Sequence, residues 1–173
     1  MLVSGAAGAV GHIVGQLAKN WVAYILFKIK FWVKKHWFGF VKGCKAIGVV
    51  GSEEKANWCK KDLGFDHVID YKKVNWSDAL KEIAPDGVDV YFDNVGGEYY
   101  TNVINRHMKL GGRVLVCGSI QNYNDIDKKL VEATNINILM KELTVKGFMC
   151  YSYFDKWPLA FVEMNKLIQE VIF

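Results

Sequence analysis

Three glycines near the start of the chain are the first residues whose type and spacing could do chemistry. Gly5, Gly8 and Gly11 stand between a short apolar segment at residues 1–4 and a helical pattern that follows them. Glycine permits a tight turn and lets the backbone approach a pyrophosphate, while the helix N-terminus offers free N–H groups to the anion. An ordinary strand-to-helix turn is the alternative. The spacing favours a pyrophosphate site at Gly8, Ala9, Val10 and Gly11.

A second candidate group follows the next apolar segment, which ends Val49-Val50-Gly51. An acidic residue at this tip would bond the ribose 2′-hydroxyl of NAD and repel a 2′-phosphate, and the tip carries none. The Ser52 hydroxyl can donate a hydrogen bond, and Lys55, one turn into the next helix, can meet a phosphate. NADPH is therefore favoured over NADH. The alternative is that Lys55 is an ordinary solvated lysine.

Further polar and small residues come where later apolar segments stop. Ligands of parallel sheets bind outside the carboxyl ends of the strands, so these positions should meet at one edge. They are Tyr71, Asn94 and the run Cys117, Gly118, Ser119, Ile120, Gln121, Asn122 and Tyr123.

The elements that must position these residues alternate between strand and helix along the chain. Ser52 can cap a helix that Gly64 stops, and glycine pairs turn the chain at 96–97 and 111–112. Such alternation predicts an α/β fold with a doubly wound parallel sheet, the Rossmann NAD(P)-binding fold. The expected strands are 1–4, 46–50, 67–70, 88–93 and 113–117, and the expected helices after the first are 53–63, 77–83 and 98–108.

Length and composition bound the class of protein. The 173 residues suit one domain, and 51% hydrophobic with 23% charged residues exclude a disordered chain and a polytopic membrane protein. The net charge of +4 hides a local excess, because residues 1–52 hold seven lysines and no acidic residue. That excess is too local to indicate nucleic-acid binding. The four cysteines share no CxxC spacing and the histidines no ligand spacing, so we expect reduced thiols, a cytoplasmic location and no metal.

Five stretches of the chain, taken in order, carry a family resemblance. They are Gly5-Ala-Ala-Gly-Ala-Val-Gly11, Gly51-Ser-Glu-Glu-Lys55, Leu63-Gly-Phe-Asp66, Tyr91-Phe-Asp-Asn-Val-Gly-Gly97 and Cys117-Gly-Ser-Ile. Together they resemble the cofactor domain of the alkenal and prostaglandin reductases, a zinc-independent family of medium-chain dehydrogenases/reductases. The resemblance covers about 1–19 and 42–170.

The resemblance implies NADPH-dependent reduction of the carbon-carbon double bond of α,β-unsaturated aldehydes and ketones, such as 2-alkenals and 15-oxoprostaglandins. It implies that Lys55 meets the 2′-phosphate, Tyr71 the adenosine side, and Asn94 with 117–123 the nicotinamide side. The stretch Phe148-Met-Cys-Tyr-Ser-Tyr153, with Phe148 and Tyr151, would close over the nicotinamide. Tyr123 and Tyr153 are the candidate catalytic hydroxyls near the substrate carbonyl.

Three departures from the family qualify this expectation. We expect that the GroES-like catalytic domain that precedes the fold in the family is absent, that the chain stops short of the returning C-terminal strand, and that residues 20–41 are an aromatic and basic insertion. We expect a single dinucleotide-binding domain over 1–173. Lysines interrupt the apolar run of the insertion well before it reaches the length of about 18 residues that a transmembrane helix needs. The sequence therefore disfavours a membrane span, and contact of 20–41 with a membrane surface is not the favoured interaction.

Two other functions stay open. One is a quinone oxidoreductase of the same superfamily, and the other is a catalytically inactive NADPH-binding fragment. The expected partners are a small-molecule enone or enal and, as in the family, a second copy of the chain in a homodimer.

Overall fold

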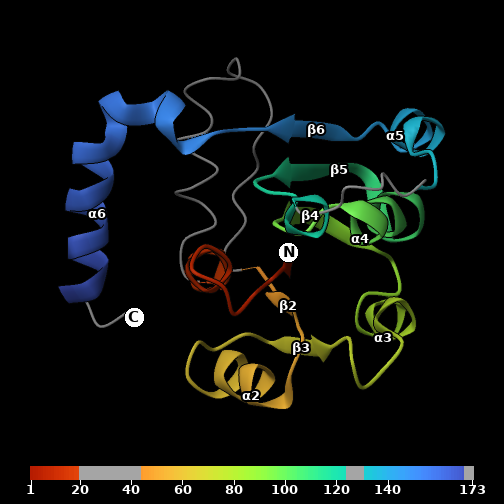
Figure 1. Ribbon diagram of the computed structural model, residues 1–173, viewed down its shortest axis with the longest axis horizontal. Helices are drawn as coiled ribbons and strands as arrows, with labels where there is room; N and C mark the ends of the chain where they lie inside the picture. Colours follow the sequence, from red (N-terminus) through yellow and green to blue (C-terminus); the bar gives the residue numbers. More distant parts are fainter. Residues whose placement is uncertain (20–43, 124–130, 170–173) are drawn as a thin grey trace.

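The chain folds around a parallel sheet. The computed structural model describes residues 1–19, 44–123 and 131–169. Within these ranges six strands form one sheet in the order β3-β2-β1-β4-β5-β6, and every neighbouring pair is parallel (Figure 1). The strand order reverses between β1 and β4, as in a doubly wound dinucleotide-binding fold. This confirms the predicted fold class.

The strands are short and mostly apolar, and helices connect them. The strands are β1 Leu2–Ser4, β2 Ile47–Val50, β3 His67–Asp70, β4 Val88–Asp93, β5 Met108–Val116 and β6 Thr144–Gly147. The described part of the first helix covers 11–19. The later helices are α2 Glu53–Lys61, α3 Trp76–Ile83, α4 Gly97–Asn102, α5 Asn135–Met140 and α6 Trp157–Gln169, with the shorter turns η1 Val103–His107, η2 Ile120–Asn122 and η3 Cys150–Lys156.

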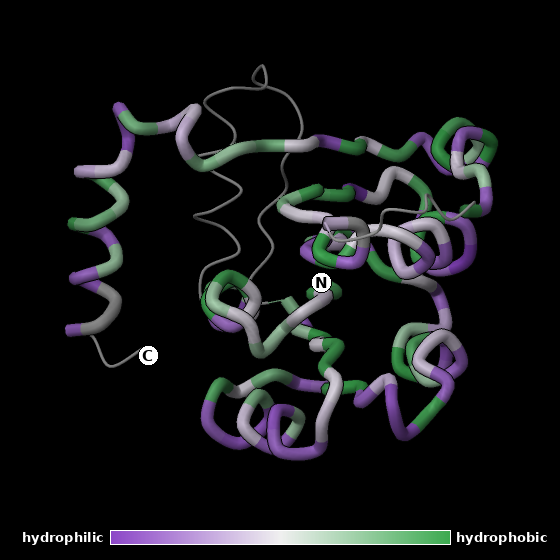
Figure 2. Tube along the Cα trace, in the orientation of Figure 1, coloured by the Kyte–Doolittle hydropathy of each residue, from purple (hydrophilic) through white to green (hydrophobic). Residues whose placement is uncertain are grey.

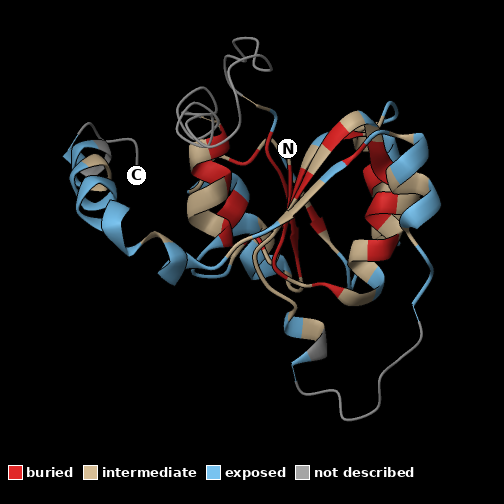
Figure 3. Ribbon diagram, turned by 90° about the horizontal axis from the view of Figure 1, so that it is seen from above, coloured by how far each residue is buried: buried red, intermediate tan, exposed pale blue. Residues whose placement is uncertain are grey.

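Helices cover both faces of the sheet, so the strands are buried from two sides. On one face Leu80 of α3 and Ile104 of η1 belong to the buried cluster, and on the other Cys59 of α2 and Phe65 do. Figure 3 shows buried residues along the strands and on helices to either side of them, and Figure 2 shows hydrophilic residues on α2. Burial on both faces explains why the strands read as continuous apolar runs.

The expected elements lie close to the observed ones, with one correction. As predicted, Ser52 caps α2, since its Oγ accepts a hydrogen bond from Lys55 N at 3.3 Å, and Gly64 follows the helix with a φ of +69°. The expected helix 98–108 instead passes into a π-helical turn, and β5 begins at Met108 and not at 113. The cause is that Gly111, with a φ of +70°, lies in a strand irregularity where a turn was predicted.

The C-terminal part adds β6 at the edge of the sheet and then leaves it. Val116 of β5 pairs with Gly147 of β6, which brings the chain after β6 beside the chain after β5. Beyond η3, α6 lies apart from the sheet (Figures 1 and 3). The predicted insertion at 20–41 lies outside the described residues, and its membrane contact stays a prediction.

Candidate functional site

The turn after β1 is shaped by backbone hydrogen bonds and by lack of room. Gly8 N donates to Gly5 O at 2.9 Å, and His12 donates to Gly8 O twice, from its backbone N at 3.1 Å and from its Nδ1 at 2.8 Å. A Cβ on Gly11 would lie 2.3 Å from Gly5 O, so only glycine fits there. Residues 8–10 are exposed ahead of the first helix. The turn can therefore present N–H groups to an anion.

The chain after β2 carries a cation that other residues leave available. The Ser52 Oγ accepts a hydrogen bond from Lys55 N, so the Ser52 hydroxyl proton stays available for donation to a ligand. The Lys55 side chain is exposed, and no described carboxylate pairs with it. Nearby Glu53 is instead 2.5 Å from Lys73, and this hydrogen bond lowers the pKa of Glu53. Lys55 is thus the cation at this end of β2.

Tyr71 follows β3 and lies against the chain that follows β2. A Cβ on Gly51 would lie 2.7 Å from the Tyr71 hydroxyl, so the phenol packs directly on the chain after β2. The Tyr71 ring meets Tyr99 edge-on with 5.7 Å between centroids, and Tyr99 in turn packs on Trp76 at 4.9 Å. The aromatic contacts hold the partly exposed phenol at the carboxyl edge of the sheet.

A fully buried carboxylate organises the turn after β4. Asp93 Oδ1 accepts hydrogen bonds from the Ser4 hydroxyl at 3.0 Å and the Tyr91 hydroxyl at 2.6 Å. The backbone N–H of Val95 donates to Oδ1 at 3.0 Å, and that of Gly96 approaches both oxygens at 3.1 and 3.2 Å. Burial, together with the charge of Asp93, raises the pKa of Tyr91 well above its ordinary value, so the phenol keeps its proton. These internal partners occupy the carboxylate and give it a structural role.

Asn94 is locked next to the glycine turn. Its backbone N donates to Ser4 Oγ at 3.0 Å, and its Nδ2 donates to Ser4 O at 2.7 Å. A Cβ on Gly5 would lie 3.6 Å from the Asn94 Cβ, so the two turns are in contact. No described residue donates to the Asn94 Oδ1, which leaves this oxygen as an acceptor for a ligand.

Backbone hydrogen bonds attach the loop after β5 to the turn after β4. Residues 117, 118, 120 and 121 donate backbone hydrogen bonds of 2.8 to 3.2 Å to the carbonyl oxygens of 93–95. Ser119 N donates to the Tyr123 hydroxyl at 3.2 Å. A Cβ on Gly96 would lie 2.4 Å from the Ser119 Oγ, so the loop and the turn are closely packed.

An open hollow of about 570 Å³ lies between the loops that follow β5 and β6. Tyr123 is 67% exposed, and Tyr153 is half-buried with Lys156 Nζ 5.4 Å from its ring centre. Burial, followed by the nearby Cys150, raises the pKa of the Cys117 thiol. The residues that line the hollow are Val116, Cys117, Gly118, Ser119, Tyr123, Gly147, Phe148, Met149, Ser152 and Tyr153.

The predicted site residues fall into two groups at the carboxyl edge. Ser52, Lys55 and Tyr71 lie after β2 and β3, whereas six predicted residues line the hollow: Cys117, Gly118, Ser119, Tyr123, Phe148 and Tyr153. The glycine turn and Asn94 lie between these groups. Ile120 and Tyr151 are exposed beside the hollow without lining it.

Sequence reasoning missed four residues that shape or line these groups. Val116 and Gly147 line the hollow, and Ser4 and Asp93 hold Asn94 in place. A hydroxyl on the last residue of β1 and a carboxylate on the last residue of β4 are the signals that could have indicated the pair.

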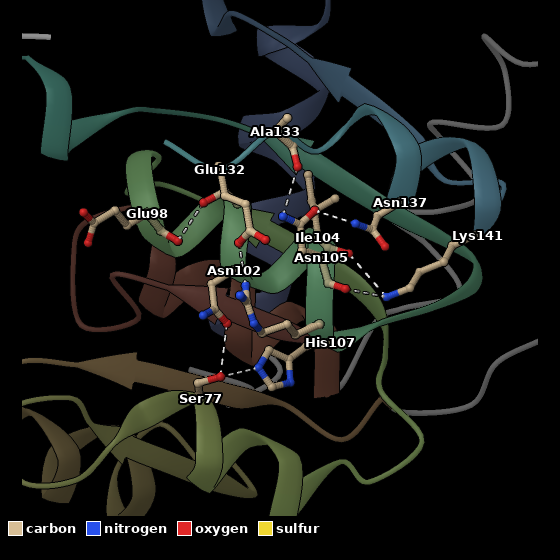
Figure 4. A network of polar contacts seen from close by, with 12 residues as sticks. Ser77, Glu98, Asn102, Ile104, Asn105, His107, Glu132, Ala133, Asn137 and Lys141 are labelled. Atoms are coloured by element: carbon tan, nitrogen blue, oxygen red, sulfur yellow. Dashed lines mark hydrogen bonds and ion pairs between the residues drawn. The ribbon is translucent and has the colours of Figure 1, made fainter. Parts of the chain in front are cut away.

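A second polar cluster ties the helices of one face together (Figure 4). The Ser77 hydroxyl lies 2.7 Å from His107 Nε2 and 3.1 Å from Asn102 Oδ1, and His107 is buried. Lys141 Nζ donates to the carbonyl oxygens of Ile104 and Asn105 at 3.4 and 3.2 Å, at the end of the π-helical turn. These contacts join α3, η1 and the end of α5. They satisfy buried polar groups, and none of these residues lines the hollow.

The described residues hold neither a candidate metal centre nor a candidate membrane span. In the described ranges, no three His, Cys, Asp or Glu side chains are grouped to hold a metal ion. No described helix combines the length and apolar character needed to span a membrane.

Comparisons with known proteins point to one family. The profile of the zinc-binding dehydrogenases matches residues 40–167. Prostaglandin reductase 1 of Bos taurus is 44% identical over 154 residues, which are 88% of this chain and 40% of that protein. The NADP(+)-dependent 2-alkenal reductase of Nicotiana tabacum is 35% identical over 169 residues, 95% of this chain and 41% of that protein.

The fold comparison agrees. A crystal structure of CurA from Vibrio vulnificus in complex with NADPH matches with a TM-score of 0.78 and 28% identity, over 99% of this chain and 46% of that one. The chain spans about two-fifths of the length of most of the curated relatives it matches. Sequence and fold together make this chain a member of the zinc-binding dehydrogenase family, among the zinc-independent medium-chain reductases related to prostaglandin reductase 1.

Proposed function

We propose that this chain is the cofactor-binding part of an NADPH-dependent reductase of the carbon-carbon double bond of α,β-unsaturated aldehydes and ketones. The observation that carries the proposal is an arrangement along one edge of the sheet. Lys55, the glycine turn, Asn94 and the hollow follow one another after β2, β1, β4 and β5. A dinucleotide that bridges the point where the strand order reverses would meet them in this sequence.

The residues present fit NADPH. Gly11 keeps the turn tight, because a Cβ there has no room, and the exposed residues 8–10 leave their backbone accessible to a diphosphate. Lys55 and the Ser52 hydroxyl would hold the 2′-phosphate, and the Tyr71 phenol would flank the adenosine. Asn94 Oδ1 and the 117–120 loop would orient the nicotinamide amide. Phe148 and Tyr151 would cover the ring.

The hollow is the proposed place for the substrate. NADPH, when bound, supplies the hydride that the β-carbon of the substrate receives. Tyr123 and Tyr153 both line the hollow, so either phenol can donate a hydrogen bond to the substrate carbonyl oxygen. The mostly apolar lining, with Val116, Phe148 and Met149, suits an alkenyl chain. Relatives named prostaglandin reductase 1, 2-alkenal reductase and (+)-pulegone reductase support this substrate class.

The experiment that tests the cofactor is a fluorescence titration of the chain with NADPH and with NADH. We expect NADPH to bind more tightly, and Lys55→Ala to weaken NADPH roughly tenfold, about 1.4 kcal/mol, while leaving NADH unchanged. Lys61→Ala is the matched control, because Lys61 is an exposed lysine in the last turn of the same helix. Equal loss in both variants, or equal affinity for the two cofactors, would contradict the assignment.

A quinone oxidoreductase is the alternative that the sequence left open. The structure of Escherichia coli quinone oxidoreductase with NADPH has a TM-score of 0.70 at 24% identity, a likeness of fold alone. The names of the more similar relatives favour enals and enones. Turnover of 2-alkenals and 15-oxoprostaglandins against a quinone, measured by NADPH oxidation, separates the two activities, and faster quinone turnover would favour the alternative.

A further inference from the structure

Two residues that the proposed function does not use stand directly behind the proposed nicotinamide site. Ser4 ends β1 and Asp93 ends the neighbouring β4, and both are buried. The Ser4 hydroxyl donates to Asp93 Oδ1 at 3.0 Å and accepts from Asn94 N at 3.0 Å. Ser4 also accepts the Asn94 side-chain amide on its carbonyl oxygen at 2.7 Å. One serine therefore fixes both the backbone and the side chain of Asn94.

Asp93 extends this control to the wall of the hollow. Its carboxylate orders the backbone N–H groups of Val95 and Gly96 at 3.0 to 3.2 Å. The carbonyl oxygens of 93–95 in turn carry the 117–121 loop, part of which lines the hollow. Tyr91 supplies a further hydroxyl to the same carboxylate oxygen at 2.6 Å. A displacement of Asp93 would therefore move Asn94 and the loop together.

We propose that Ser4 and Asp93 are positioning residues, which preorganise Asn94 and the 117–121 loop for the nicotinamide half of the cofactor. Neither touches the ligand in this assignment. Their hydrogen bonds leave the Asn94 Oδ1 without a donor among the described residues, so the acceptor is held ready before the ligand arrives. The inference rests on the proposed function, because it names which half of the bound NADPH depends on these two residues.

The contacts assign no such role toward the adenosine half. Lys55, Ser52 and Tyr71 are held by α2, by Gly51 and by Tyr99, with no hydrogen bond to Ser4 or Asp93. Preorganisation by the buried pair should therefore act on one end of the dinucleotide. A residue that only stabilises the fold would weaken both ends equally.

The test compares NADPH with adenosine 2′,5′-bisphosphate, which carries only the adenosine half. Both are titrated by calorimetry into the wild-type chain and into Ser4→Ala. We expect Ser4→Ala to weaken NADPH roughly tenfold, since two hydrogen bonds to Asn94 and Asp93 are lost, and to leave the bisphosphate within about twofold. Ser77→Ala is the matched control, because it removes another partly buried hydroxyl with two side-chain partners, away from the hollow. This control should bind both ligands like the wild type.

A milder variant keeps the test decisive if Ser4→Ala does not fold. Tyr91→Phe removes only the 2.6 Å hydrogen bond to Asp93 and keeps the buried ring. It should weaken NADPH by roughly threefold and the bisphosphate not at all. Equal weakening of both ligands, or of neither, overturns the inference while leaving the proposed function intact. A folded wild-type chain that binds the bisphosphate and NADPH equally overturns the inference too, and one that binds neither removes the proposed function.

Discussion

The turns after β1 and after β4 lie in contact at the same edge of the sheet, yet they are built in opposite ways. The first is shaped by missing side chains, since a Cβ at Gly11 would lie 2.3 Å from Gly5 O and 2.9 Å from the Ala6 Cα. The second is shaped by a side chain, the buried carboxylate of Asp93, which collects hydroxyl and backbone donors.

The comparison assigns a different task to each turn: the glycine turn lets a ligand approach the backbone, and the Asp93 turn orients the groups that the ligand meets. A glycine turn exposes backbone N–H groups and lets a diphosphate approach, with little control over direction. A carboxylate inside the protein fixes the position of its neighbours, because any movement would leave a buried charge without partners. The two turns therefore suit the two tasks that a dinucleotide site needs.

The largest effect on this comparison is expected from Gly11→Ala, which adds a methyl group to the turn after β1. Gly11→Ala places Cβ against backbone atoms that cannot give way, so we expect a loss of about 1–3 kcal/mol in unfolding free energy and loss of NADPH binding. Denaturant unfolding and cofactor titration measure the two effects. Gly147→Ala is the control for stability, since nothing lies within 4 Å of a Cβ there. A stable Gly11→Ala that binds NADPH normally would refute the account of this turn.

A smaller effect is expected from the one side chain that helps the glycine turn. His12 Nδ1 donates to Gly8 O at 2.8 Å. We expect His12→Ala to weaken NADPH roughly fivefold, about 1 kcal/mol, and His12→Asn, whose amide can reach the same carbonyl, to recover most of it. Failure of asparagine to rescue would show that the ring acts by something other than this hydrogen bond.

The smallest effect concerns the pH dependence of stability, which we expect to arise outside both turns. Burial, followed by the charges of Lys141, Arg106 and Lys81 and opposed by Asp78, lowers the pKa of His107 from its usual 6.5. Below about pH 6.5 His107 binds a proton more readily in the unfolded chain than in the folded chain. The free energy of unfolding is therefore highest above about pH 6.5, and it decreases as the pH falls.

Thermal unfolding between pH 7.5 and pH 5.5 measures this loss. The melting temperature of His107→Gln should fall less over this range than that of the wild type. A wild-type chain and a variant with parallel pH profiles would place the acid-sensitive group elsewhere.

The sequence predicted well the parts that depend on backbone freedom and on apolar periodicity. Gly11, the cap at Ser52 and the apolar run of β4 each leave a local signature, and the structure has each where it was expected. The start of β5 was missed because Gly111 and Gly112 give the same signature in a turn and in a strand irregularity.

The parts that depend on distant partners could not be predicted from local pattern. Asp93 follows a buried apolar run in the sequence, but its structural role needs Ser4, which lies 89 residues away in sequence. The hollow combines the chain after β5 with that after β6, and only strand pairing brings the two together. Tyr123 and Tyr153 both line this hollow, and their roles as hydrogen-bond donors to the substrate remain predictions.

The hydrogen bond from Ser4 to Asp93 has a consequence for the order of folding. It closes a loop of 89 residues, so its entropic cost must be met before the bond can form. Local elements such as α2 and α3 form without it, whereas Asn94 takes its final place only once β1 has docked against β4. We therefore expect the acceptor proposed for the nicotinamide to be set after the local helices, once β1 and β4 have paired.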